Sequence, residues 1–158
     1  MHRLLIIGVV STALSFSPGA FAQGPGGTPD EAKAMLMKAL AAVKADKAAA
    51  LDMINNGEGG FLDRDLYPFC ANTSDGKIVA IANLNAKKLL GQDQRTLKDG
   101  NGKAFGAELY AAGQKPEGEI TEVRGYLFSK PGADATPVPK NSFVGRVGDV
   151  ACGVGYYK

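Results

Sequence analysis

One stretch near the middle of the chain has the pattern of two strands joined by a tight turn. It reads Asp65-Leu66-Tyr67-Pro68-Phe69-Cys70-Ala71-Asn72-Thr73-Ser74-Asp75-Gly76-Lys77-Ile78-Val79-Ala80. Apolar residues flank an Asp-Gly pair, which favours a hairpin turn because Gly accepts a positive φ. We therefore predict antiparallel strands over residues 66–72 and 77–83.

The sequence before this hairpin has the periodicity of a helix. Thr28, Pro29 and Glu31 form the pattern of an N-cap, a first-turn proline and a capping box. Apolar residues then recur largely at three- and four-residue steps to Ile54. We predict one long helix to about Ile54, ended by Asn55-Asn56-Gly57 because Asn and Gly tolerate the left-handed cap conformation.

The sequence after the hairpin predicts a mixture of strands and one short helix. We expect an irregular connection over 83–96, a helix over 104–113, strands over 119–129, 142–147 and 150–157, and a loop over 130–139. The Gly148-Asp149 pair favours a tight turn between the last two strands. The resulting fold class is α+β, with a long N-terminal helix packed on a five-stranded antiparallel sheet.

The first residues have the features of a secretory signal peptide. A short basic start at His2 and Arg3 precedes an apolar run over 4–16 and the small residues Ala20 and Ala22. We expect a signal peptide over 1–22, a flexible leader over 23–27 and one domain over 28–158. The alternative is an uncleaved anchor, although the apolar run is short for a membrane span.

The expected mature chain contains few of the groups that catalysis or metal binding usually needs. Removing Arg3 leaves 17 basic against 16 acidic residues, since the whole chain has 18 and 16. This near-neutral balance without a basic run argues against nucleic-acid binding. The only histidine, His2, would be removed, which excludes His-based catalytic sets and His-ligated zinc sites. We expect no metal and no cofactor.

Two cysteines in an exported chain are expected to form a disulfide. Cys70 and Cys152 are the only cysteines, and an even number in an oxidising compartment favours pairing. The alternative is a redox-active pair, but the sequence lacks the Cys-x-x-Cys motif that lowers a thiol pKa. A structural disulfide is therefore the favoured interpretation.

One alternating set of side chains could form an anion site. Arg124, Tyr126 and Phe128 are spaced two residues apart in a predicted strand, so simple alternation places them on one face. A guanidinium beside two aromatic rings can hold a small carboxylate. An exposed Arg beside ordinary core aromatics explains the same pattern, and the residues alone leave both interpretations open.

The order of short motifs along the chain resembles the single Cache domains, a family of PAS-like extracytoplasmic sensors. That family has a Tyr-x-Phe strand, an Asp-Gly turn, a Leu-x-Gly-x-Asp segment and an Asp-x-Asn-Gly-Lys-x-Phe segment that opens a helix. The matching residues here are Tyr67-Pro68-Phe69, Asp75-Gly76, Leu89-Leu90-Gly91-Gln92-Asp93 and Asp99-Gly100-Asn101-Gly102-Lys103-Ala104-Phe105. The resemblance covers about residues 61–158.

The later motifs match this family with some departures. Tyr126-Leu127-Phe128 stands where members have Tyr-x-Trp, and Pro139-Lys140-Asn141-Ser142-Phe143 stands where they have Pro-Lys-x-Ser-Tyr. Ala82-Asn83 occupies the end of the second strand, where many members have His-Pro. These departures leave the expected fold unchanged, but they make the identity of the ligand uncertain.

The resemblance implies an arrangement and a role. The first and last strands of the family's sheet lie side by side, which would make Cys70 to Cys152 a cross-strand disulfide. The implied role is a periplasmic or secreted domain that binds a small metabolite, expected to be a short carboxylate or similar polar molecule, and that signals through a separate membrane receptor or transporter. The residues expected at the ligand are Tyr67, Phe69, Arg124, Tyr126, Phe128 and Lys140.

Two other functions stay open at this point. The first is a structural or adaptor protein whose pocket is filled by its own side chains. The second is an enzyme that works without histidine, through carboxylates, Lys or Tyr. No motif requires such an enzyme, so we expect none.

The signal peptide leads to a direct prediction. Exported protein should begin at Gln23, because Ala20 and Ala22 place the cleavage site directly before it. N-terminal sequencing of exported material measures this. Retention of Met1 would instead indicate an anchored protein.

Overall fold

This computed structural model describes residues 26–132 and 134–158. The predicted signal peptide and most of the leader lie outside these residues. The elements, in chain order, are α1 (Pro29–Ala45), α2 (Lys47–Asn56), β1 (Pro68–Asn72), β2 (Ile78–Ile81), η1 (Leu84–Leu89), η2 (Gln94–Thr96), α3 (Phe105–Gly113), β3 (Thr121–Ser129), β4 (Pro137–Val147) and β5 (Val150–Tyr157), where η denotes a 3₁₀ helix.

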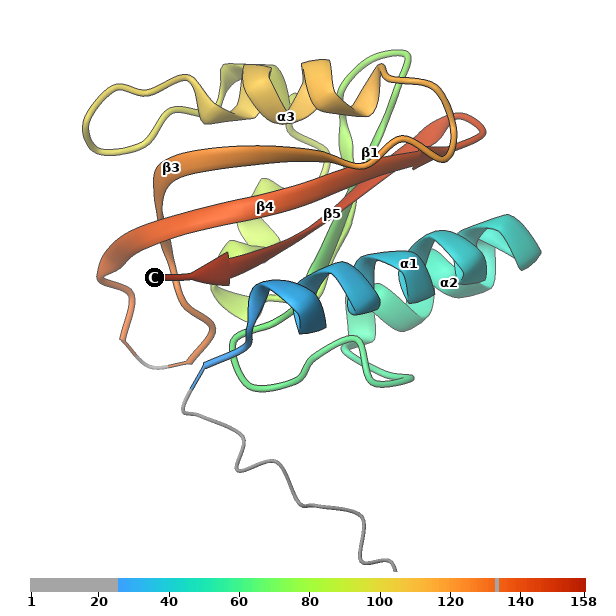
Figure 1. Cartoon of the computed structure of the whole chain (residues 1–158), viewed down its shortest axis with the longest axis horizontal. Coiled ribbons are helices and arrows are strands. Elements are labelled where there is room, and N and C mark those ends of the chain that lie inside the picture. The colour runs from blue at the N-terminus through green and yellow to red at the C-terminus, as the bar shows by residue number, and fades with distance from the viewer. Residues whose placement is uncertain (1–25, 133) are drawn as a thin grey trace, which may run out of the picture.

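The five strands form one antiparallel sheet in the order β2-β1-β5-β4-β3. Helices α1 and α2 lie on one face of this sheet and α3 lies on the other (Figure 1). The first and last strands are neighbours. The predicted α+β fold class and this strand adjacency are confirmed.

The N-terminal helix begins as predicted but is not continuous. Thr28 accepts a hydrogen bond from the Glu31 amide at 3.2 Å, and Glu31 accepts one from the Thr28 amide at 2.8 Å, which completes the capping box. The single long helix was wrong, because Asp46 is extended and separates α1 from α2. Its side chain accepts from the Ala49 amide at 3.0 Å, so it starts a second helix. Gly57 ends α2 at φ 68°.

Strand β4 is longer than the sequence predicted. It begins at Pro137, so the expected loop over 130–139 and the expected strand start at residue 142 were wrong. Pro137 and Pro139 argue against a strand in the sequence, because proline has no amide hydrogen to donate to a neighbouring strand. Here β5 pairs with β4 only from Lys140 onward, and Pro137 and Pro139 pair with β3 alone. Proline is tolerated where a strand has a single neighbour.

The remaining boundaries differ by a few residues. Strand β1 starts at Pro68 rather than at residue 66, β2 covers 78–81 rather than 77–83, β3 starts at residue 121 rather than 119, and α3 starts at residue 105 rather than 104. The connection over 83–96 contains the two 3₁₀ helices. Asn83 caps the first of them by accepting from the Asn85 amide at 3.0 Å, and this ends β2 early.

The predicted disulfide is confirmed. Cys70 in β1 stands directly opposite Cys152 in β5, and their Cα atoms are 4.0 Å apart. Both residues are buried in the core between the sheet and the α1–α2 layer. The bond joins strands that are far apart in sequence and therefore fixes their register.

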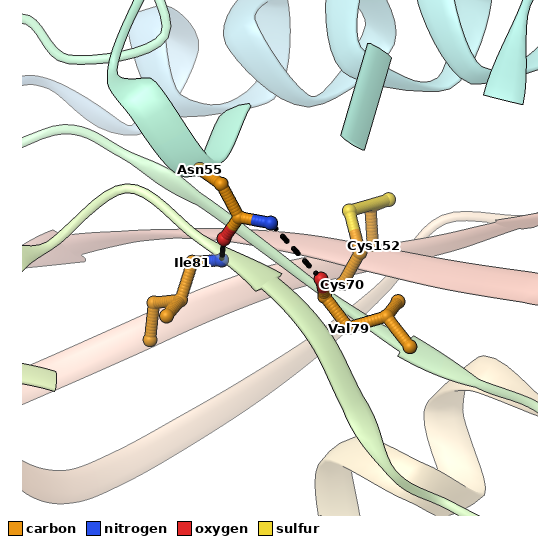
Figure 2. Close-up of a disulfide and its surroundings, with 5 residues drawn as sticks. All are labelled: Asn55, Cys70, Val79, Ile81 and Cys152. Carbon is orange, nitrogen blue, oxygen red and sulfur yellow. Dashed lines mark hydrogen bonds between the residues drawn. A yellow bond between two sulfur atoms is a disulfide. The ribbon is translucent and has the colours of Figure 1, made fainter. Parts of the chain in front are cut away.

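A side-chain amide covers the edge of the sheet next to this disulfide. Asn55, at the end of α2, donates to the Val79 carbonyl at 3.1 Å and accepts from the Ile81 amide at 3.0 Å (Figure 2). It therefore pairs with β2 much as another strand would. Blocking an edge in this way limits pairing with other chains.

Loss of the disulfide should destabilise the fold without changing it. We expect Cys70→Ser with Cys152→Ser to lower the free energy of unfolding by about 2–4 kcal/mol, because the unfolded chain loses a long loop constraint. Urea unfolding of the variant and the parent protein under non-reducing conditions measures the difference. As a chemical check, alkylation of exported protein without reductant should label neither cysteine. Two labelled thiols would show that the bond does not form.

Candidate functional site

A pocket lies between α3, the segment that carries η1 and η2, and the sheet. Five of the six predicted ligand residues line it, namely Tyr67, Phe69, Tyr126, Phe128 and Lys140. The rest of the lining comes from Ile78, Ile81, Leu89, Gln94, Leu97, Phe105 and Leu109. The cavity is small, at about 30 Å³. We call it the inner pocket.

Aromatic stacking closes the side of the inner pocket below α3. Phe105, at the start of α3, lies nearly parallel to Tyr126 with ring centroids 4.7 Å apart. It meets Phe128 edge-on at 5.9 Å. These offset and edge-to-face contacts are the favoured geometries of aromatic pairs, so the three rings form a stable wall between β3 and the helix.

Lys140 supplies the positive charge of the inner pocket. The residue is 2% exposed, and its Nζ donates to the Tyr67 hydroxyl at 2.7 Å. Nζ also lies 4.2 Å from the ring centroid of Tyr67, 4.8 Å from Phe128 and 4.9 Å from Tyr157. Within the part of the chain that the structure describes, no carboxylate pairs with it.

Buried hydroxyl groups continue from Lys140 into the sheet. The Tyr67 and Tyr157 hydroxyl oxygens are 3.3 Å apart, and the Tyr157 hydroxyl donates to the Ser129 carbonyl at 2.7 Å. Burial raises the pKa of Tyr157 well above its usual value, so its hydroxyl stays protonated. The Tyr157 hydroxyl proton therefore points at the Ser129 carbonyl. An oxygen lone pair of Tyr67 faces the ammonium of Lys140.

A second hydroxyl pair fixes the wall residue Tyr126. Its hydroxyl lies 2.5 Å from the Ser142 hydroxyl, and both residues are buried. Burial raises the pKa of Tyr126 far above its usual range. Tyr126 is therefore a neutral, hydrogen-bonded wall of the pocket.

Arg124 does not lie in the inner pocket, and the expectation that it shares a face with Tyr126 and Phe128 was wrong. Pairing between β3 and β4 shifts between Val123 and Tyr126, and Gly125 there has φ 68°. Such a bulge inserts extra residues and breaks the simple alternation of faces. Val123 and Tyr126 are both buried against α3, whereas the Arg124 side chain is 73% exposed.

Arg124 instead belongs to a surface cluster around Glu122. Its guanidinium lies 2.5 Å from the Glu122 carboxylate, which also accepts from the Tyr156 hydroxyl at 2.6 Å. Burial opposes ionisation of Glu122, but the hydrogen bonds from Tyr156 and Arg124 outweigh it and lower its pKa. The charge of Arg124 is therefore already matched by a neighbouring carboxylate.

Several lining residues were not assigned to the site from the sequence. Phe105 and Leu109 lie on the buried face of α3, within the helix predicted over 104–113, and that face closes the inner pocket. Leu89, Gln94 and Leu97 come from the irregular segment. Their side chains carry no periodic signal, so only the folded path of that segment places them.

Two further observations limit the chemistry. Among residues 26–132 and 134–158, no group of three or more His, Cys, Asp or Glu side chains could hold a metal ion. Helices in the same residues are all too short or too polar to cross a membrane.

The inner pocket offers one ammonium, several hydroxyls and aromatic walls. This combination is suited to holding a small anion.

Comparison with known proteins gives matches only among solved structures. No protein-family model and no curated protein sequence matches the chain. A methyl-accepting chemotaxis protein from Vibrio parahaemolyticus RIMD 2210633 matches with a TM-score of 0.62 and 27% identity, over 81% of this chain and 86% of that one.

Two further structures match at 24% identity over 81% of this chain. One is described as a periplasmic sensor domain of a chemotaxis protein, with a TM-score of 0.58 over 88% of its chain. The other is described as showing the structural basis for carboxylic acid recognition by a Cache chemosensory domain, with a TM-score of 0.61 over 91% of its chain. All three similarities extend over most of both chains.

The lone ammonium predicts an unusual stability pattern. Lys140→Met should fold and be at least as stable as the parent protein, because a buried charge without a carboxylate partner is replaced by an apolar chain of similar length. Tyr67→Phe should cost about 1.5–3 kcal/mol in the parent protein, because it removes the hydroxyl that accepts from the ammonium. In the Lys140→Met background the same substitution should cost clearly less. Chemical unfolding of the four proteins measures this coupling, and equal costs in both backgrounds would contradict it.

Proposed function

Because the chain has the fold of the single Cache-like sensor domains, we propose that it is a sensory domain that binds a short carboxylate beside Lys140. The observation that carries this proposal is the buried ammonium of Lys140, which lines the pocket and, among the described residues, forms no ion pair with a carboxylate. Tyr67, Phe69, Tyr126 and Phe128 complete the binding surface.

Electrostatics favours an anionic ligand over a neutral one. A buried charge is costly unless it is paired and hydrogen-bonded. An ammonium has three donors, and the Tyr67 hydroxyl uses one of them. A carboxylate would supply both the missing charge and acceptors for the other donors. The surrounding rings contribute cation–π attraction, but they accept no conventional hydrogen bond.

Size favours a compact ligand. A cavity of about 30 Å³ has room for roughly two water molecules. A carboxylate of two to four carbons is larger than this space and would require Phe105 or a neighbouring wall residue to move. Such adjustment of side chains is common when proteins bind ligands.

The comparisons support a sensory, ligand-binding role. One matched domain is described by its recognition of carboxylic acids and another as periplasmic. We propose that the protein acts in the periplasm or outside the cell and signals through a separate membrane receptor or transporter. The matched structures are described as chemotaxis and sensor proteins and not as enzymes, which supports a role without catalysis.

The small cavity favours one competing function. If the inner pocket is permanently filled by its own side chains, the protein is a structural or adaptor protein. That alternative also predicts a closed, aromatic-lined pocket. It does not explain why the pocket retains an ammonium, which Met or Leu could replace at lower cost.

Carboxylate binding should be directly measurable. We expect one or more of acetate, propionate, lactate and pyruvate to stabilise the exported protein, by about 2.7 kcal/mol at a concentration 100 times the dissociation constant. Lys140→Met should weaken binding by about 10- to 150-fold, because a charge-assisted hydrogen bond is worth about 1.5–3 kcal/mol. Thermal-shift screening followed by calorimetric titration measures both.

Arg124→Ala is the matched control, because it removes a positive charge outside the inner pocket. It should leave the affinity within about twofold of the parent value, as expected for an exposed charge. Equal loss of affinity in both variants would point to a general electrostatic effect. If no carboxylate stabilises the protein, the filled-pocket function gains support.

A further inference from the structure

A second cavity shares four lining side chains with the inner pocket, namely Leu89, Leu97, Phe105 and Phe128. We call it the outer cavity. It measures about 350 Å³, against about 30 Å³ for the inner pocket. Small-molecule sites typically begin at about 300 Å³, so the outer cavity has the room that the inner pocket lacks.

The lining of the outer cavity combines an apolar floor with cations. Phe105, Leu127 and Pro137 contribute apolar surface, and Lys88 and Lys98 contribute two positive charges. Both lysines are exposed. In the described part of the chain neither forms an ion pair. Lys140 does not line this cavity.

The one carboxylate in the lining is already satisfied. Asp99 accepts from the backbone amides of Asn101 at 2.9 Å, Lys103 at 3.0 Å and Leu127 at 3.0 Å. Its charge is thus held by the backbone at the turn before α3 and at β3. The two lysine ammonium groups are left as the charges that a ligand could meet.

Hydrogen bonds hold two sides of the outer cavity together. Asn85 in η1 donates to the carbonyls of Lys130 at 3.2 Å and Gly132 at 2.6 Å. Asn83 donates to the Ser129 carbonyl at 3.5 Å. These contacts tie η1 to the β3–β4 hairpin, so the cavity exists before any ligand enters. Pre-organised walls reduce the entropy cost of binding.

We propose that the outer cavity is a second binding site, for an organic anion with an apolar body about the size of one aromatic ring. The ring would lie on the apolar floor of Phe105, Leu127 and Pro137, and its acidic group would face Lys88 and Lys98. This site is separate from the carboxylate site at Lys140. It differs in size and in its cations.

Benzoate is the probe, with benzyl alcohol as the matched neutral ligand. Titration of methyl-labelled exported protein, followed by NMR, distinguishes the two cavities. The methyl groups of Ala86 and Ala135 line only the outer cavity, whereas Ile78 and Ile81 line only the inner pocket. We expect benzoate to shift the two alanine signals and not the two isoleucine signals. Benzyl alcohol should bind more weakly.

Substitutions separate this site from the one at Lys140. Lys88→Ala with Lys98→Ala should weaken benzoate binding about three- to tenfold, a modest loss because exposed charges are screened by solvent and salt. Lys44→Ala with Lys115→Ala removes the same charge from exposed positions outside both cavities and should change binding less than twofold. Lys140→Met should leave it unchanged.

Three outcomes would overturn the proposal. The first is the absence of shifts at Ala86 and Ala135. The second is an equal shift at Ile78 and Ile81, which would make the outer cavity an entrance to the inner pocket. The third is an affinity for benzoate that is the same in the Lys88/Lys98 and Lys44/Lys115 variants. The benzoate and short-carboxylate titrations can succeed or fail independently.

Discussion

The register between β1 and β5 is the constraint on which the rest of the structure depends. Cys70 and Cys152 stand directly opposite each other, and their disulfide prevents either strand from slipping. A slip of one residue would reverse the faces of every side chain on β1. It would carry Phe69 out of the inner pocket and bring an apolar core residue into it. The covalent bond on the α1–α2 side therefore determines what faces α3.

The segment just before β1 connects this register to the first helix. Arg64 adopts φ 55° and pairs with Glu31 at 2.8 Å, while Asp65 accepts from the Gly27 amide at 2.6 Å and lies 3.0 Å from Lys130. Two consecutive side chains thus hold the start of α1. Tyr67 follows two residues later in the chain. The same short segment therefore fixes the position of the beginning of α1 and the position of Tyr67, which lines the inner pocket.

Regular, local patterns made much of this fold predictable, and exceptions to those patterns limited the prediction. The capping box and the Asp-Gly hairpin depend on a few neighbouring residues whose geometry is nearly independent of context. The disulfide joins residues 82 apart in the chain, and the cysteine count predicted it. Asp46 could not be recognised as a helix break, because the apolar periodicity continues across it. The bulge at Gly125 likewise gave no signal, since alternation is assumed wherever a strand is predicted. That one bulge places Arg124 on the surface. The proposed anion site therefore rests on Lys140, which lies between the predicted loop over 130–139 and the predicted strand over 142–147.

The position of Lys140 also shows why its role should not be judged from stability alone. Its contacts connect four strands in one polar chain, from Lys140 in β4 through Tyr67 next to β1 and Tyr157 in β5 to the Ser129 carbonyl in β3. An apolar side chain at position 140 would avoid the cost of burying a charge. It would also leave the Tyr67 hydroxyl without its ammonium donor. The buried ammonium therefore contributes little to holding these strands together, and the proposed anion site gives a reason for its burial at the point where they meet.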